Sequence, residues 1–158
     1  MSAAEASPNI EKYIRSITER REAEGLPSME ECQAILEYAA ENTSDAVFGI
    51  GYYYFAENYW EQNNLKQTMN CLTECSKCFR AAKMYDFLAR TYNMMGAVSD
   101  RRSNRVVALN YYYTGLQCAE EYELHYVLGM VSMNIAGILM RMEHIAEAAG
   151  YYERAAAA

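Results

Sequence analysis

The sequence predicts an all-α fold of about eight helices in antiparallel hairpins. Three observations carry this prediction. Apolar residues recur at helical spacing along the chain, no stretch alternates apolar and polar residues long enough for a strand, and glycine (8 residues) and proline (2 residues) stand between the periodic segments. The chain has 158 residues, of which 52% are apolar, so it is long enough to bury roughly 70% of its unfolded surface. We therefore expect one soluble domain over residues 1–158.

The first predicted hairpin spans residues 9–42. Ser7 is placed to cap its first helix and Pro8 to begin it, and the helix ends near Gly25. Its apolar stripe has the spacing i, i+3, i+4, i+7: Ile10, Tyr13, Ile14, Ile17. Ser28 and Glu31 form a capping box for the second helix. The second stripe repeats the spacing: Cys32, Ile35, Leu36, Ala39.

Three later hairpins, 46–80, 83–121 and 123–155, are predicted from self-similar residue sets. The first helices share the spacing 3, 1, 3: Tyr52, Phe55, Ala56, Tyr59; Tyr85, Leu88, Ala89, Tyr92; Ser132, Ile135, Ala136, Leu139. The second helices share the spacing 4, 3: Thr68, Leu72, Cys75; Ala108, Tyr112, Gly115; Ala148, Tyr152, Ala155. Turns are expected between the helices at Asn63-Asn64, Gly96 and Glu143-His144.

This pattern resembles the tetratricopeptide repeat (TPR), a helix-turn-helix unit of about 34 residues. In that family a small residue lets the two helices approach and an aromatic ring fills the groove between hairpins. The resemblance covers residues 46–155, with Ala56, Ala89 and Ala136 as the small residues. It implies an α-α superhelix whose first helices line a concave groove, with hairpin 9–42 as a degenerate repeat or a cap.

The middle hairpin departs from the family period. The position numbers of Ala56 and Ala89 differ by 33, but those of Ala89 and Ala136 differ by 47. We expect longer helices or a projecting loop between Gly96 and Ala108. The basic run 100–105 falls in this expanded turn, where it is either a solvated loop or a docking point for phosphate or an acidic partner surface.

TPR geometry also implies a set of groove residues that would bind a protein or peptide segment through aromatic and methionine anchors. These are Tyr53, Glu57, Trp60, Lys83, Asp86, Arg90, Asn93, Met133, Met140 and Arg141. Arg90 and Arg141 would orient acidic groups of the ligand. The alternative for Met130, Met133 and Met140 is that they are core residues or face a partner subunit. A clamp for a terminal carboxylate is disfavoured, because its cation positions hold Tyr53 with Glu57 and Met133 with Gly137.

A narrower resemblance supplies the alternative function. Residues 85–96 and 108–116 are similar to the repeat-bearing N-terminal region of some bacterial signalling proteins that end in a diguanylate cyclase domain, although the chain has no GGDEF run. This resemblance implies a regulatory or dimerisation module of a larger protein, and thus a homodimer.

Composition argues against several other classes. The formal charge of −7 opposes binding to nucleic acid, and the longest apolar stretch, 126–140, is too short and too interrupted to span a membrane. Residues 1–9 carry no secretory signal, so we expect a cytoplasmic protein. Cys71, Cys75 and Cys78 share a helical face, but four ligands are needed and both histidines are distant, which favours core thiols over metal ligands. No catalytic constellation is found, so we expect a non-enzyme without cofactor.

Overall fold

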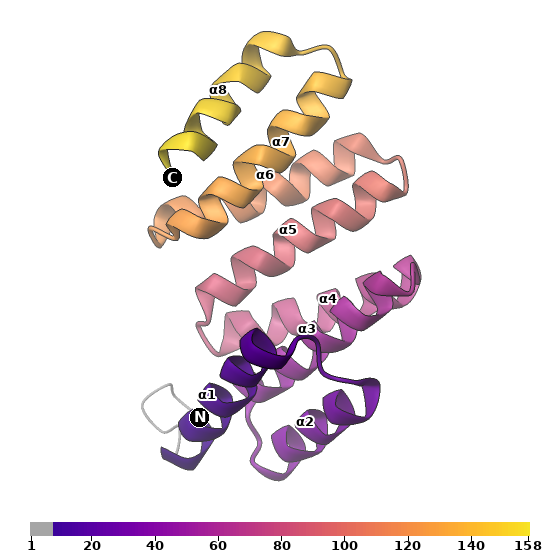
Figure 1. Cartoon of the computed structure of the whole chain (residues 1–158), viewed down its shortest axis with the longest axis vertical. Coiled ribbons are helices and arrows are strands. Elements are labelled where there is room, and N and C mark those ends of the chain that lie inside the picture. Colours follow the sequence, from indigo (N-terminus) through magenta and orange to yellow (C-terminus); the bar gives the residue numbers. More distant parts are fainter. Residues whose placement is uncertain (1–7) are drawn as a thin grey trace. The chain divides into compact units, whose positions relative to one another are not determined.

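The computed structural model describes residues 8–158, and within this range the chain folds into eight α-helices without a strand (Figure 1). The all-α prediction is confirmed. The predicted Ser7 cap lies outside the described residues. The helices are α1 (Pro8–Glu24), α2 (Met29–Glu41), α3 (Asp45–Glu61), α4 (Leu65–Ala81), α5 (Tyr85–Arg101), α6 (Arg105–Glu121), α7 (His125–Arg141) and α8 (Ile145–Ala157).

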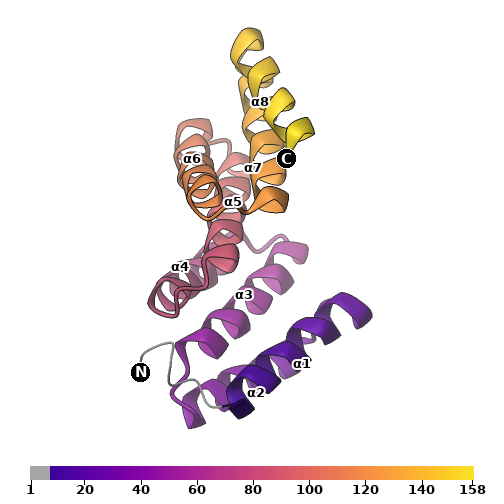
Figure 2. The same cartoon turned by 90° about the vertical axis from the view of Figure 1, so that its left-hand side faces the viewer.

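The helices form two compact units, residues 1–84 and 85–158. In the first unit, α3 packs against both α2 and α4. In the second unit, α5 pairs with α6 and α7 pairs with α8, while α7 also contacts α5 and α6 (Figures 1 and 2). The predicted antiparallel hairpins are therefore present in both units. A single domain and a superhelical stack remain predictions.

The turns after α2 share one backbone motif. A residue with positive φ, between 49° and 64°, recurs at position numbers that rise by 20: Thr43, Asn63, Lys83, Ser103, Glu123, Glu143. One residue later, the backbone N–H bonds back to a carbonyl five positions earlier, as in Asn104 N–H to Ser99 O at 2.9 Å. This is the Schellman geometry, which satisfies the last free carbonyls of a helix. The helices α3 to α7 accordingly share one length, 17 residues, and a three-residue turn follows each.

The motif defines a hairpin repeat that spans two such intervals and corrects the predicted register. Ala56, Gly96 and Ala136, whose position numbers rise by 40, are the equivalent small residues, and all three are buried. The predicted turn at Gly96 is wrong because Gly96 lies inside α5. Ala89 lies two helical turns before Gly96 and therefore shares its face. That coincidence produced the unequal spacings of 33 and 47.

The expected expansion of the middle hairpin is wrong for the same reason. Its turn is residues 102–104, as short as the others, and the run 100–105 spans the end of α5, this turn and the first residue of α6. The turn contains neither glycine nor proline, and Ser103 adopts the left-handed conformation with φ 62°. Ser103 and Asn104 are common turn residues, and Asn104 caps α6 by accepting a hydrogen bond from the Val107 N–H, but the turn lacks the glycine or proline that marks a reversal most strongly.

Each unit has its own apolar core. In the first unit, Ile50 and Phe79 are fully buried, and the ring of Phe79 lies against Gly49. In the second unit, Val131, Ile135 and Ile138 of α7 are fully buried in a cluster with residues of α5, α6 and α8. These cores determine which face of each helix is left for solvent or a partner.

Candidate functional site

The ten predicted groove residues fall in both units. Tyr53, Glu57 and Trp60 lie half-buried on α3. Lys83 is exposed in the turn before α5, at φ 57°, so it belongs to a turn and not to a helix face. The remaining residues lie on the α5 and α7 helices of the second unit: Asp86, Arg90, Asn93, Met133, Met140, Arg141.

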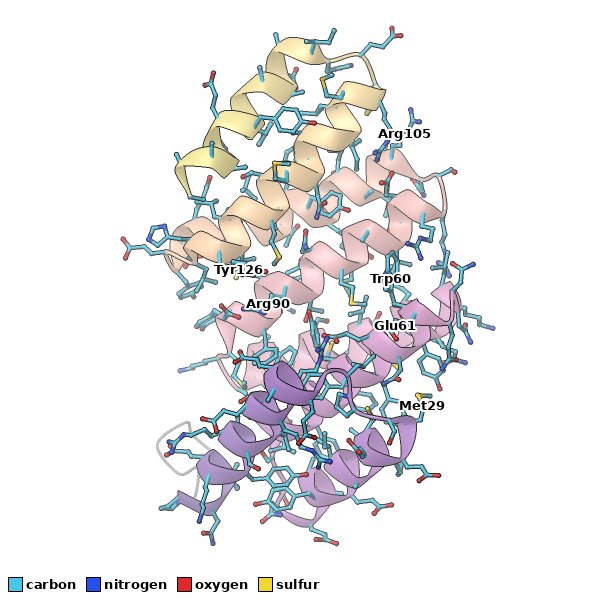
Figure 3. All side chains as sticks on the ribbon, viewed as in Figure 1. Met29, Trp60, Glu61, Arg90, Arg105 and Tyr126 are labelled. Carbon is cyan, nitrogen blue, oxygen red and sulfur yellow. The ribbon has the colours of Figure 1, made fainter. Side chains whose placement is uncertain are left out.

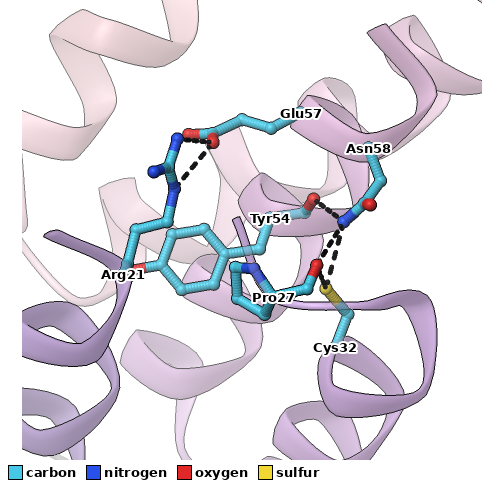
Figure 4. A network of polar contacts seen from close by, with 6 residues as sticks. All are labelled: Arg21, Pro27, Cys32, Tyr54, Glu57 and Asn58. Atoms are coloured by element: carbon cyan, nitrogen blue, oxygen red, sulfur yellow. Dashed lines mark hydrogen bonds and ion pairs between the residues drawn. The ribbon is translucent and has the colours of Figure 1, made fainter. Parts of the chain in front are cut away.

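In the first unit, Glu57 is engaged by α1. Both Nε and Nη2 of Arg21 donate to its Oε2, at 3.1 and 2.7 Å (Figure 4). Burial lowers the pKa of Arg21 and the hydrogen bond and charge of Glu57 raise it, with a net increase. Tyr53 packs edge-on against the rings of Tyr54 and Phe79. Glu57 therefore holds α1 on α3 and is already neutralised.

The neighbouring residue, Asn58, extends this network and was not foreseen from the sequence. Its amide donates to Pro27 O at 2.9 Å, to Tyr54 O at 3.0 Å and to the Cys32 sulfur at 3.5 Å (Figure 4). The repeat-equivalent residues, Val98 and Ile138, are apolar and fully buried. The sequence feature that marks this contact is a polar residue at a repeat position that is apolar in the other two hairpins. It can be recognised only when the hairpins are aligned by their turns, with position numbers that differ by 40.

A cavity of about 310 Å³ lies between α1 and α2, and no sequence motif indicates it. Apolar side chains such as Ile17 and Ile35 line it together with Arg20 and Arg21. Arg20 pairs with Glu24 and Glu31, as Arg21 pairs with Glu57. The arginines of the cavity are thus balanced by carboxylates and leave no strong attraction for a charged ligand.

In the second unit, side chains of α5 and α7 meet along one face. Arg90 Nε lies 2.6 Å from Asp86 Oδ1, and its guanidinium stands 5.5 Å from the centroid of the Tyr126 ring (Figure 3). Farther along, Asn134 Nδ2 donates to Asn93 Oδ1 at 2.8 Å. The Arg90 to Tyr126 and Asn134 to Asn93 contacts, together with the Arg141 to Asp100 pair at 2.5 Å, hold α5 and α7 against each other.

Arg90 and Arg141 were predicted to orient acidic ligand groups, and each already faces a carboxylate of its own unit. Their charges are partly neutralised before any ligand arrives. Tyr126, Asn134 and Asp100 were not predicted as site residues. Tyr126 occupies the repeat position of Asp86, so the correct register would have identified it from the sequence.

The α7 helix presents a stripe that we call the methionine face: Tyr126, Met130, Met133, Met140. Tyr126 is 69% exposed, Met133 51% and Met140 43%. The alternative interpretation of Met133 and Met140 as core residues is therefore wrong within this chain, whereas Met130 is half-buried. Next to this face lies a shallow depression that is largely open to solvent, lined by three of its members together with Tyr152 and alanines at the C-terminal end of α8.

The cysteine stripe of α4 is packed into the protein. Cys75 is fully buried, and burial raises the pKa of both Cys71 and Cys78 to about 11. These thiols stay protonated near neutral pH and are poor nucleophiles. Nowhere in residues 8–158 do three or more His, Cys, Asp or Glu side chains gather in a way that would hold a metal ion. No helix in the same range has the length and apolar character needed to cross a bilayer.

The comparisons with known proteins leave the family open. No family model matches the chain, and neither a curated protein nor a solved structure shows significant similarity to it. The resemblance to the TPR family therefore stays a prediction based on residues 46–155. The functional proposal rests instead on the geometry of the individual units.

Proposed function

We propose that the protein is a non-catalytic interaction module whose methionine face binds an extended or helical segment of a partner protein. The observation that carries the proposal is the exposure of Tyr126, Met133 and Met140 on one side of α7. Folding does not require large apolar side chains at those positions, and contiguous exposed apolar surface marks interaction sites. The proposal includes a TPR-like hairpin stack in the cytoplasm, where the free thiols would stay reduced.

The chemistry of this face suits peptide recognition. Methionine side chains are flexible and polarisable, so they adapt to different apolar partners, and tyrosine is enriched among residues that dominate binding energy. The cation–π contact with Arg90 orients the Tyr126 ring before a ligand arrives. The adjoining open depression adds the Tyr152 side chain and alanines at the C-terminal end of α8 to the surface that a partner could cover.

A displayed library of random peptides tests the proposal. Peptides are selected on the wild-type protein and then measured against the variant Met133→Glu/Met140→Glu. We expect selected peptides to carry apolar anchors and to lose at least about tenfold in affinity for the variant, because charges would be buried without partners. The control, Asn110→Glu/Gln117→Glu, makes the same charge change at two exposed α6 positions and should bind as the wild type does. Equal binding of every selected peptide to both variants would contradict the proposal.

The same face also supports the alternative function, a regulatory or dimerisation module of a bacterial signalling protein. A second copy would then cover Met133 and Met140. Sedimentation of the wild type and of Met133→Glu/Met140→Glu separates the two. A dimer that dissociates only in this variant would assign the face to self-association, and a monomer in both would leave it to a peptide partner.

A further inference from the structure

The second unit has a second unusual surface at the edge where α5 meets α6 and α7 meets α8. The Arg141 to Asp100 ion pair joins the ends of α5 and α7 just before these two turns, which lie at the same edge of the unit (Figure 1). We call this surface the arginine edge and define it by these side chains: Arg101, Arg102, Arg105, Val106, Val107, Arg141, Ile145. Figure 3 labels Arg105 there.

The arginine edge is unlike the same turn of the first unit. The repeat-equivalents of Arg101, Arg102 and Arg105 in the α3–α4 hairpin are acidic, amide and aliphatic: Glu61, Gln62, Leu65. The equivalents of Val106 and Val107 are Lys66 and Gln67, polar residues as expected at exposed positions. Because both turns have the same backbone motif, the fold does not demand arginine or valine here.

Two of its charges, on Arg102 and Arg105, are available to a partner. Arginine is protonated at any physiological pH and binds carboxylates through two parallel hydrogen bonds. Arg102 and Arg105 are exposed, and neither forms an ion pair with another residue in the range 8–158. The helices α6 and α8 begin at this edge and α5 and α7 end there, so their dipole ends offset one another and the positive field comes from the arginine side chains. The edge is thus a local positive site on a chain of charge −7.

Apolar side chains stand among these cations. Val106 is 65% exposed and Ile145 is 64% exposed, each in the first turn of its helix. A β-branched residue at such a helical position lowers helix propensity, and most of its surface stays unburied in the folded chain. A partner that covers these side chains would gain the free energy of burying apolar surface that folding leaves exposed.

We propose that the arginine edge docks an acidic protein segment that carries aliphatic or aromatic anchors, separately from the methionine face. Carboxylates of the segment would pair with Arg102 and Arg105, and its apolar side chains would cover Val106 and Ile145. An anionic membrane fits less well, because Asp100, Glu143 and Glu147 interrupt the basic surface, whereas a protein segment can place its carboxylates at Arg102 and Arg105 alone. Nucleic acid, with its continuous row of phosphates, is disfavoured by the same interrupting carboxylates.

Random peptides displayed on phage test this inference. Selection on the wild type is followed by removal of every clone that also binds Arg102→Glu/Arg105→Glu. We expect the remaining peptides to be enriched in Asp and Glu and to contain an aliphatic or aromatic residue. Their affinity should fall at least about tenfold in the double variant and severalfold in Val106→Ser, and should weaken as salt rises from about 50 to about 300 mM.

Matched controls separate this surface from the rest of the chain. Lys66→Glu/Lys77→Glu makes the same charge change at exposed positions of the first unit and should leave binding unchanged. Met133→Glu/Met140→Glu should also leave it unchanged, so failure of the methionine face and failure of this inference are distinguishable. Circular dichroism checks that every variant is folded.

Two results would overturn the inference. One is that no peptide discriminates the wild type from Arg102→Glu/Arg105→Glu, or that the discriminating peptides are not acidic. The other is arginine-dependent binding to vesicles of phosphatidylserine and phosphatidylcholine without binding to acidic peptides, which would assign the edge to a membrane surface.

Discussion

The aromatic ring of Tyr112 on α6 lies directly over Gly96 on α5. A Cβ atom built on Gly96 would overlap Cε1 and Cδ1 of the ring, and Tyr112 itself is only 3% exposed. The two helices approach closely because Gly96 has no side chain, and Ala56 and Ala136 hold the equivalent positions in the α3–α4 and α7–α8 hairpins. This contact defines the register of the hairpin repeat.

Gly96→Ala is therefore expected to destabilise the protein by about 1–3 kcal/mol, because the added methyl group must displace a buried ring. Gly150→Ala provides the opposite case on α8, where nothing lies within 4 Å of the new Cβ. It should stabilise by up to about 1 kcal/mol through helix propensity. Urea unfolding followed by circular dichroism measures both, and two changes of the same sign would contradict the assigned packing.

The turn motif leads to a second prediction, at Ser103. Its φ of 62° suits glycine and is unfavourable for β-branched residues. Ser103→Gly should raise the free energy of unfolding by up to about 1 kcal/mol, and Ser103→Val should lower it by a similar amount or more. If the valine variant were as stable as the glycine variant in urea unfolding, residue 103 would not adopt the left-handed conformation.

Asn58 carries the third prediction. Replacement by Ala removes the side-chain donor to Pro27 O and leaves that carbonyl without this hydrogen bond. We expect a loss of about 1–2 kcal/mol and faster hydrogen exchange in α1 and the turn that follows. Mass spectrometry of exchanged peptides measures the effect, with α7 and α8 as internal references. Uniform acceleration over the whole chain would show that Asn58 does not act as a local tie.

Alkaline pH provides the fourth prediction. Burial raises the pKa of Cys32 from 9.0 to about 12, and burial together with the charge of Asp100 raises that of Tyr112 from 10.0 to about 12. The unfolded chain loses these protons first as pH rises, so folded stability is complete below about pH 9 and falls between about pH 9 and 12. Tyr112→Phe should make this decline shallower. A urea midpoint that stays constant from about pH 8 to 11 would contradict the burial of these groups.

Sequence signals predicted the helices well because those signals are local. The stripe of Ile10, Tyr13, Ile14 and Ile17 and the cap formed by Ser28 are enough to identify the first hairpin. Ser28 does accept a hydrogen bond from the Glu31 N–H, at 3.1 Å. Helical periodicity and capping depend on neighbours in sequence, so a single chain is enough to recognise them.

Register and site geometry were harder to predict for a physical reason. Residues two helical turns apart share a face, so the residue pattern alone could not decide whether Ala89 or Gly96 is the small residue of the repeat. The turn at Ser103 contains no glycine, so the sequence did not show clearly that the helix containing both residues ends only there. The partners of Arg90 and Arg141 also depend on how α7 lies on α5, which helical periodicity does not specify. The evenly spaced residues with positive φ resolve the register, and the packing of α7 on α5 then sets the site.

Methyl NMR of the ten methionines tests the docking role of the methionine face at the level of single side chains. The titrated peptide is one that is selected on the wild-type protein and binds Arg102→Glu/Arg105→Glu as strongly as the wild type, so that it does not depend on the arginine edge. We predict that the methyl signals of Met133 and Met140 shift or broaden, while the signal of the buried Met95 stays in place. Saturable binding that leaves Met133 and Met140 unperturbed would place the docking surface elsewhere and contradict the proposed function.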